Sequence, residues 1–304
     1  MKLTAKQLKG NSRFKNIWKY RWFYIMIIPV IILSLMFFYY PMLGIRFAFF
    51  EYTPFKGPNF KGFANFEELF SNHQFWIAFK NTIIISTTKL VLTTFVSVVV
   101  SLLLNEVANL AAKKFFQTLI YLPHFLSWVV VASIFSIILS PQHGFMNEVL
   151  IHIGIIDNPI YFMNESGWWR KVYYVVNIWK ETGWGTIIFL ATLTGIDPQL
   201  YEAAAIDGVK NRFQEMIYIT IPNMKPQMLF AAVMSIVNAF QNGVISTQLA
   251  GNPTPQYAAQ LIVNHIEDYG FIRYEMGYAA ATSVVLLGIV VIFSRISKKL
   301  FAED

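Results

Sequence analysis

The chain has 304 residues, of which 56% are hydrophobic and only 13% are charged, and its formal net charge is +7. This composition is too apolar for a soluble domain of that length and predicts an integral membrane protein. Cysteine is absent, which excludes disulfides, thiolate metal sites and cysteine nucleophiles within this chain.

Six stretches are apolar over the roughly 20 residues that a spanning helix needs. They cover residues 23–43, 82–104, 116–139, 172–194, 226–245 and 278–296. Most of the 24 Lys and Arg residues precede the first stretch, follow the last or lie in the short loops on that same side. The six stretches predict six transmembrane helices of a multi-pass cell-membrane protein, and the positive-inside rule predicts that both termini lie in the cytoplasm. This distribution of basic residues also argues against nucleic-acid binding.

Residues 1–22 are basic with interleaved aromatic residues, which predicts an amphipathic stretch lying on anionic lipid. The first span, 23–43, is too long for a cleavable signal peptide and is expected to be retained. Residues 44–80 form a predicted external loop. Within it, 65–79 have a helical pattern with Asn65 as a cap. This helix is either a docking surface for a binding protein or an interfacial anchor.

The second and third spans each hold one polar residue of interest. Lys89 lies about two turns below the outer end of the second span, where it either snorkels to the surface or lines a pathway. His124 follows Pro123 early in the third span. A lone histidine there is expected to be a packing residue, because no second metal ligand lies at helical spacing.

The fourth span contains the most polar point of any apolar segment, the run from Trp179 to Gly185. Its Lys180 and Glu181 can satisfy one another or neighbouring helices, and its two glycines permit close helix approach or a local break. The run is either a packing knot or the wall of a translocation cavity, with the faces of Trp179 and Trp184 available to sugar rings. We favour the cavity wall.

Residues 196–225 form a polar loop between two apolar segments. Asp197 and Pro198 predict a helix start, and Gly208 predicts its stop. A second helical run from about residue 211 to 218 is expected to end before Pro222.

The loop contains Glu202-Ala203-Ala204, then Gly208, then Ile219-Thr220-Ile221-Pro222. This string resembles the "EAA" loop in membrane subunits of binding-protein-dependent ABC importers, especially permeases for sugars and complex oligosaccharides. The interval from Gly208 to Pro222 is one residue longer than in the commonest form, and Val209 stands where alanine is usual.

The resemblance implies an all-α type I ABC importer permease with a core over residues 81–297 and a cytoplasmic tail at 298–304. The first helix would lie outside that core, against a second, homologous permease. Residues Glu202, Ala203, Ala204, Asp207, Gly208 and Pro222 would couple the loop to an ATPase dimer. ATP and Mg would be bound by that dimer, since this chain has no phosphate-binding loop, and a solute-binding protein would deliver the sugar.

The fifth span places amide side chains on one stripe, at Asn238, Gln241 and Asn242, where they suit sugar hydroxyls or bonds between helices. With Trp179, Lys180, Glu181 and Trp184 they are our candidates for the substrate pathway. Two other classes remain open at this stage: a membrane-embedded glycan-modifying enzyme and an ion-coupled secondary transporter.

Overall fold

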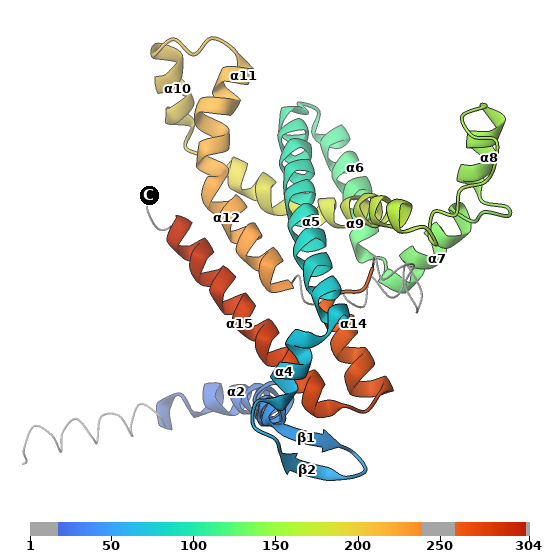
Figure 1. Cartoon of the computed structure of the whole chain (residues 1–304). Helices are drawn as coiled ribbons and strands as arrows, with labels where there is room; N and C mark the ends of the chain where they lie inside the picture. The colour runs from blue at the N-terminus through green and yellow to red at the C-terminus, as the bar shows by residue number, and fades with distance from the viewer. Residues whose placement is uncertain (1–17, 239–258, 302–304) are drawn as a thin grey trace, which may run out of the picture.

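The computed structural model describes residues 18–238 and 259–301, which are almost entirely helical (Figure 1). The elements before the long helices are α2 (Arg21–Ser34), η1 (Leu35–Tyr39), α3 (Tyr40–Met42), η2 (Leu43–Phe49), β1 (Phe50–Thr53), β2 (Gly57–Phe60) and α4 (Ala64–Ser71). The middle of the chain forms α5 (His73–Glu106), α6 (Leu110–Tyr121), η3 (Leu122–Phe125), α7 (Trp128–Ile138), α8 (Phe145–His152) and α9 (Ser166–Thr194). The remainder forms α10 (Pro198–Ile206), α11 (Arg212–Glu215), η4 (Met216–Thr220), α12 (Ile221–Asn238), α14 (Ile262–Glu267), η7 (Asp268–Ile272) and α15 (Met276–Phe301).

Two helical stretches of the described chain are long and apolar enough to cross a membrane, Arg21–Phe49 and His73–Glu106. A third candidate is broken: the helices Leu110–Phe125 and Trp128–Ile138 meet at a bend of 98°. The prediction of one continuous span over 116–139 is therefore wrong. Ser127 caps the second half, because its Oγ accepts from the amide of Val130 at 3.3 Å, and this cap starts a new helix.

The other predicted spans coincide with helices of the structure. Residues 172–194 lie within α9 and 278–296 lie within α15. Residues 226–238 of the fifth span lie in α12, and the rest of that span falls outside the described residues.

Helices α5 and α9 form the most extensive contact in the described chain, and the main apolar cluster lies beside it. Its fully buried members include Ile85 of α5 and Trp169, Tyr173 and Val176 of α9. Trp169 and Tyr173, the two largest of the fully buried side chains, thus belong to α9, which crosses α5 (Figure 1).

The predicted external loop is more ordered than expected. It contains an antiparallel hairpin in which Phe50 pairs with Phe60 and Thr53 with Gly57. Asn65 is not a helix cap: it lies inside α4, and its buried Nδ2 donates to the carbonyls of Ala48 and Phe50 at 2.9 and 2.8 Å. The helix expected over 65–79 is divided into α4 and the first turns of α5, because the side chain of Asn72 caps α5.

A cluster of hydrogen-bonded polar side chains joins the start of α5 to α14 and α15. Nδ2 of Asn72 donates to Oη of Tyr269 at 2.7 Å and to Oη of Tyr278 at 2.9 Å. His265 is fully buried beside them, with its Nε2 3.0 Å from Oη of Tyr278. These contacts attach the hairpin end of the molecule to the helices.

Acid is expected to destabilise the folded protein through this cluster of polar side chains. Burial lowers the pKa of His265 from 6.5 to about 4, with a smaller opposing effect from Asp268 and a smaller lowering effect from Arg273. The unfolded chain binds a proton below about pH 6.5 and the folded chain does not, so stability is lost as the pH falls from 6.5 towards 4. His265→Gln retains a hydrogen-bonding group without titrating. Thermal unfolding across this pH range should show a shallower acid dependence in the variant, and equal slopes would contradict the assignment.

Candidate functional site

Helix α10 begins and ends where the sequence predicted. Oδ1 of Asp197 accepts from the amide of Gln199 at 2.9 Å, and Pro198 occupies the first turn. The helix ends at Ile206, and Gly208 has φ +97°, a conformation that favours glycine. The amide of Val209 then donates to the carbonyl of Ala204 at 3.0 Å and closes the turn.

The surface of α10 is uncovered in this chain. Glu202, Ala203, Asp207 and Gly208 are exposed, and Ala204 is half-buried. Ile206 is 87% exposed, which is unusual for so large an apolar side chain. The helix therefore presents a small apolar and acidic face that nothing in the described chain covers.

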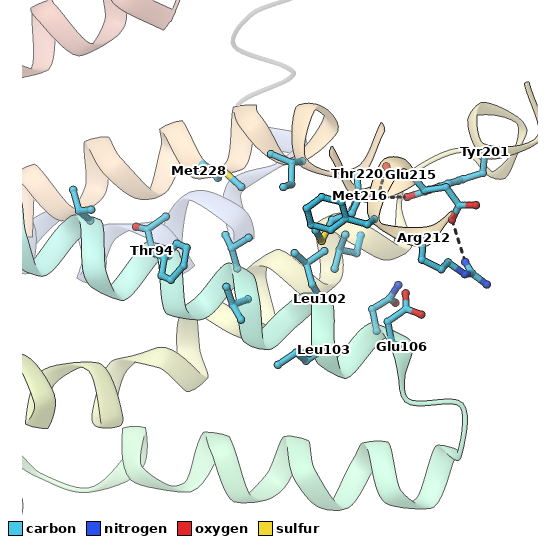
Figure 2. A pocket seen from close by; sticks show the side chains of 18 of the residues that line it. Thr94, Leu102, Leu103, Glu106, Tyr201, Arg212, Glu215, Met216, Thr220 and Met228 are labelled. Carbon is cyan, nitrogen blue, oxygen red and sulfur yellow. Dashed lines mark hydrogen bonds and ion pairs between the residues drawn. The ribbon is translucent and has the colours of Figure 1, made fainter. Parts of the chain in front are cut away.

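A contact across the loop holds α10 in place. Oη of Tyr201 lies 3.1 Å from Oγ1 of Thr220, which also donates to the carbonyl of Glu215 at 3.3 Å. Figure 2 shows Tyr201, Glu215 and Thr220 gathered at one end of a pocket. This contact links α10 to the helix that leads into α12.

The sequence predicted that the second helix of the loop ends before Pro222, and this prediction is wrong. Asn211 caps α11 by accepting from the amide of Gln214 at 2.8 Å, and the chain then continues through the π-helical turn η4 directly into α12. Pro222 is tolerated because it lies in the first turn of α12 and the wider π-helical turn precedes it. The end of the loop and α12 therefore form one continuous helical element.

A groove of about 1040 Å³ runs between α5 and the start of α12 (Figure 2). Its walls are mostly apolar and include Phe95, Leu102 and Met228, whereas Glu106 and Arg212 stand at the loop end. The α10 loop thus borders an open, apolar space between two long helices.

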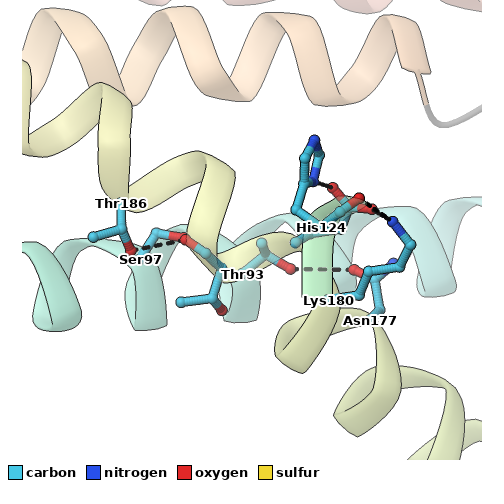
Figure 3. A network of polar contacts seen from close by, with 8 residues as sticks. Thr93, Ser97, His124, Asn177, Lys180 and Thr186 are labelled. Atoms are coloured by element: carbon cyan, nitrogen blue, oxygen red, sulfur yellow. Dashed lines mark hydrogen bonds and ion pairs between the residues drawn. The ribbon is translucent and has the colours of Figure 1, made fainter. Parts of the chain in front are cut away.

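The polar run of α9 forms a compact cluster with the break of the third predicted span. Lys180 is only 4% exposed. Its Nζ donates to the carbonyl of His124 at 2.9 Å and lies 3.6 Å from Oε1 of Glu181. Oε2 of Glu181 lies 3.2 Å from Nδ1 of His124, close enough for electrostatic attraction but without hydrogen-bond geometry. Figure 3 shows these side chains converging from α9 and η3.

The two tryptophans beside this cluster are partly exposed. Trp179 is 41% exposed and Trp184 is 53% exposed. The ring of His124 stacks on Trp184 with a centroid distance of 5.2 Å and an interplanar angle of 14°. Phe135 contacts Trp179 edge-on at 5.6 Å. Lys180 thus lies in a packed polar cluster, whereas both tryptophan side chains are partly exposed.

Two glycines allow α9 to pass close to its neighbours. A Cβ added at Gly183 would meet the carbonyl oxygen of Ile120 in α6, and one at Gly185 would meet the side chain of Ser97 in α5. The predicted role of these glycines in close helix approach is confirmed.

The structure brings together only part of the predicted substrate pathway. Trp179, Lys180, Glu181 and Trp184 share one region of α9. Asn238 is the last described residue of α12, and Gln241 and Asn242 lie outside the described residues. Sequence reasoning did not connect His124 with Glu181. The available signal was an ionisable residue beside Pro123 in an apolar segment, which marks a break that can hold a partner.

Loss of Glu181 should destabilise the protein by leaving Lys180 buried without its carboxylate. Glu181→Gln is expected to cost about 3 kcal/mol, the lower end of values for a broken buried ion pair. Lys180→Met in the same chain should recover part of this loss, since the uncompensated charge is then removed. Unfolding free energies of the two single variants and the double variant in detergent test the coupling. Simple additivity would contradict it.

Comparisons with known proteins identify the family of this chain. Residues 93–301 match the family described as "Binding-protein-dependent transport system inner membrane component". The chain is 36% identical over 291 residues to the polygalacturonan/rhamnogalacturonan transport system permease protein YteP of Bacillus subtilis (strain 168), covering 93% of this chain and 89% of the relative. It is 32% identical to protein LplB of the same organism, and the alignment covers 97% of this chain and 94% of LplB.

Solved structures show the same fold. One is a bacterial ABC transporter involved in the import of the acidic polysaccharide alginate, with a TM-score of 0.82, 34% identity and coverage of 95% of this chain and 99% of the other. Another is the bacterial alginate ABC transporter in complex with an alginate pentasaccharide-bound periplasmic protein. The TM-score is 0.83, the identity is 33%, and the match covers 96% of this chain and 98% of the other.

Proposed function

The chain belongs to the family of binding-protein-dependent transport system inner membrane components, as a sugar-importer permease, and on that premise we propose that α10 couples it to a separate ATPase. The observation that carries the proposal is the exposed face of α10, with Glu202, Ala203 and Gly208 uncovered and Tyr201 linked to Thr220. The permease is not itself an enzyme. In this proposal ATP and Mg bind to the ATPase dimer.

The proposed coupling element is mechanical. Glu202 meets a basic residue of the ATPase, while Ala203, Ala204 and Gly208 permit close approach and Ile206 supplies apolar contact. Motion of α10 passes through the contact of Tyr201 with Thr220 to η4 and α12. Because Pro222 lies within the first turn of α12, no flexible joint separates the loop from the spanning helix.

The proposed orientation follows from charge. Basic residues concentrate at the two ends of the chain and in the loop that contains Lys210, which supports six spans, cytoplasmic termini and a place in the bacterial cytoplasmic membrane. The hairpin end then faces outwards. A second, homologous permease would pack against α2, since no residue of α2 is buried in this chain.

The proposed site for a solute-binding protein is the hairpin end. Phe55 at the hairpin turn is 82% exposed and contacts Tyr274 edge-on at 5.7 Å. Tyr274 has φ +60°, a conformation disfavoured for a residue with a side chain, and such strain tends to mark functional positions. The solved relative in complex with a periplasmic protein supports this partner.

The proposed substrates are oligosaccharides that contain uronic acids. Support comes from the relatives, whose names specify polygalacturonan, rhamnogalacturonan and the acidic polysaccharide alginate. In this chain Lys180 is already occupied by Glu181 and His124, so it contributes to the fold of the pathway wall and not to the binding of a carboxylate.

Reconstitution tests the function directly. Proteoliposomes that contain this chain, its partner permease, the ATPase and the binding protein should take up oligouronates only with ATP inside. Neutral oligosaccharides of equal length serve as the comparison. Uptake by this chain without the ATPase would favour an ion-coupled carrier, and chemical change of the sugar would favour an enzyme.

The aromatic faces of α9 are proposed to contact sugar rings, together with Asn238, Gln241 and Asn242. Trp179→Ala and Trp184→Ala should change the order of preference among oligosaccharides of different length and composition, because stacking depends on the ring face presented. Transport rates for a panel of sugars measure the effect. Equal loss for every sugar would indicate a packing role instead.

A further inference from the structure

The spans predicted from the sequence carry more positive than negative charge at membrane depth. Glu181 is the only acidic residue in any of the six apolar stretches. Lys89 lies inside the second stretch and Lys180 lies inside the fourth. Because a charge within a membrane is costly unless it is paired, two lysines beside one glutamate leave one positive charge to be balanced.

The fold brings these three charges into one region between α5 and α9. Oγ1 of Thr93 on α5 lies 3.4 Å from Oδ1 of Asn177 on α9. Lys89 stands one helical turn before Thr93, and Glu181 stands one turn after Asn177. Lys89 accordingly interacts electrostatically with both Glu181 and Lys180.

The two lysines differ in how far the fold uses them. Lys180 is 4% exposed, its Nζ donates to the carbonyl of His124, and it lies 5.1 Å from the ring centre of Trp128. Lys89 is half-buried and has a contact within the chain. An ammonium group has three N–H donors, so one such contact leaves donors of Lys89 for a ligand.

Glu181 cannot neutralise both lysines. Its Oε1 lies 3.6 Å from Nζ of Lys180, and its Oε2 lies 3.2 Å from Nδ1 of His124. The side chain of Glu181 is 25% exposed, and the flanking Trp179 and Trp184 are 41% and 53% exposed. The cluster therefore lacks one negative charge and adjoins a face that a ligand can reach.

We propose that Lys89 binds the carboxylate of a uronic acid unit as the sugar passes the wall formed by α9. This inference rests on the proposed function and adds to it the residue that selects acidic over neutral sugars. A carboxylate supplies the charge that the cluster lacks, while the tryptophans offer apolar faces to the sugar ring. An inorganic anion would supply the charge but would leave the aromatic faces unused.

Equilibrium binding of trigalacturonate to the intact complex of permeases and ATPase in nanodiscs tests the site. Carboxyl-reduced trigalacturonate has the same length and linkage and is the matched neutral ligand. Lys89→Met should weaken binding of the uronate by about tenfold or more, the loss expected for a hydrogen bond to a charged group, and should leave binding of the neutral sugar unchanged. Lys89→Arg should retain most of the affinity for the uronate.

Lys80→Met is the control for the loss of a lysine, because Lys80 is exposed near the start of the same helix. Equal affinity of wild type and Lys89→Met for trigalacturonate would overturn the assignment and leave the proposed function intact. A wild-type complex that imports neutral oligosaccharides but neither binds nor imports the uronate would contradict the proposed substrate class and this site together.

A carboxylate of the second permease is the alternative partner for Lys89, and stability distinguishes it. In that case Lys89→Met would weaken the pairing of the two permeases and lower the unfolding temperature of the sugar-free complex. Our proposal predicts an unchanged or higher temperature, since the substitution removes an uncompensated charge. A lower unfolding temperature with unchanged binding of trigalacturonate would overturn it.

Discussion

Glu202→Lys is expected to abolish sugar-stimulated ATP hydrolysis while the permease still inserts into the membrane. Glu202 is exposed on α10 and makes no contact that the fold of this chain requires. At an interface with an ATPase, reversal of its charge replaces an attraction with a repulsion, which costs about 2–5 kcal/mol for a desolvated charge pair. Since about 1.4 kcal/mol corresponds to a factor of ten, stimulation should fall at least tenfold.

A graded series separates charge from packing. Glu202→Gln, Glu202→Ala and Glu202→Lys should show increasing loss of stimulated ATPase activity in reconstituted complexes, with unchanged unfolding temperature of the isolated permease. A complementary reversal on the ATPase should restore activity to the lysine variant. Full stimulation in all three variants would remove Glu202 from the coupling contact.

Gly183→Ala is expected to destabilise the protein, although alanine is the better helix former. A Cβ at this position would clash with the carbonyl oxygen of Ile120 and would lie 2.9 Å from Cα of Tyr121. Both are backbone atoms, so α9 must move away from α6 to make room. Overpacking of this kind costs about 1–3 kcal/mol, and separation of the helices would also disturb the Lys180–His124 contact.

Gly167 provides the matched control in the same helix. A Cβ there would meet nothing within 4 Å, so Gly167→Ala should be neutral or stabilise by up to about 1 kcal/mol through helix propensity. In identical detergent, Gly183→Ala should therefore lower the unfolding temperature, whereas Gly167→Ala should raise it or leave it unchanged. Equal behaviour would mean that α6 and α9 do not approach closely in the protein.

Local signals made α10 predictable. Asp197, Pro198 and Gly208 act through contacts with residues at most a few positions away, and the start and stop of α10 follow from them. The continuation through Pro222 was not predictable in the same way. Its π-helical turn depends on how η4 packs, with Ile219 and Thr220 buried, and a proline alone indicates only that a regular helix is disfavoured.

The third predicted span illustrates a second limit. Hydropathy reports that residues are apolar and does not distinguish a straight helix from two helices at 98°. The break is held by Ser127 and by Lys180, which reaches the carbonyl of His124 from 56 positions away along the chain. Contacts between such distant positions are set by the packed structure and have no signature in a single sequence.

The candidate site was likewise predicted in part. Adjacent Lys180 and Glu181 signalled a buried pair, and the flanking tryptophans signalled an accessible face. The role of Asn65 was misjudged because its side chain bonds to carbonyls in another element. His124 packs as predicted, by stacking on Trp184, but its proximity to Glu181 depends on the packed structure.

The uncovered first helix has a consequence for biogenesis. No residue of α2 is buried, and Pro29 interrupts its hydrogen bonding. If the proposed second permease covers α2, a copy made without that permease would leave this segment in contact with lipid alone. On the proposed function, the cellular abundance of this subunit should then rise and fall with the synthesis of the second permease.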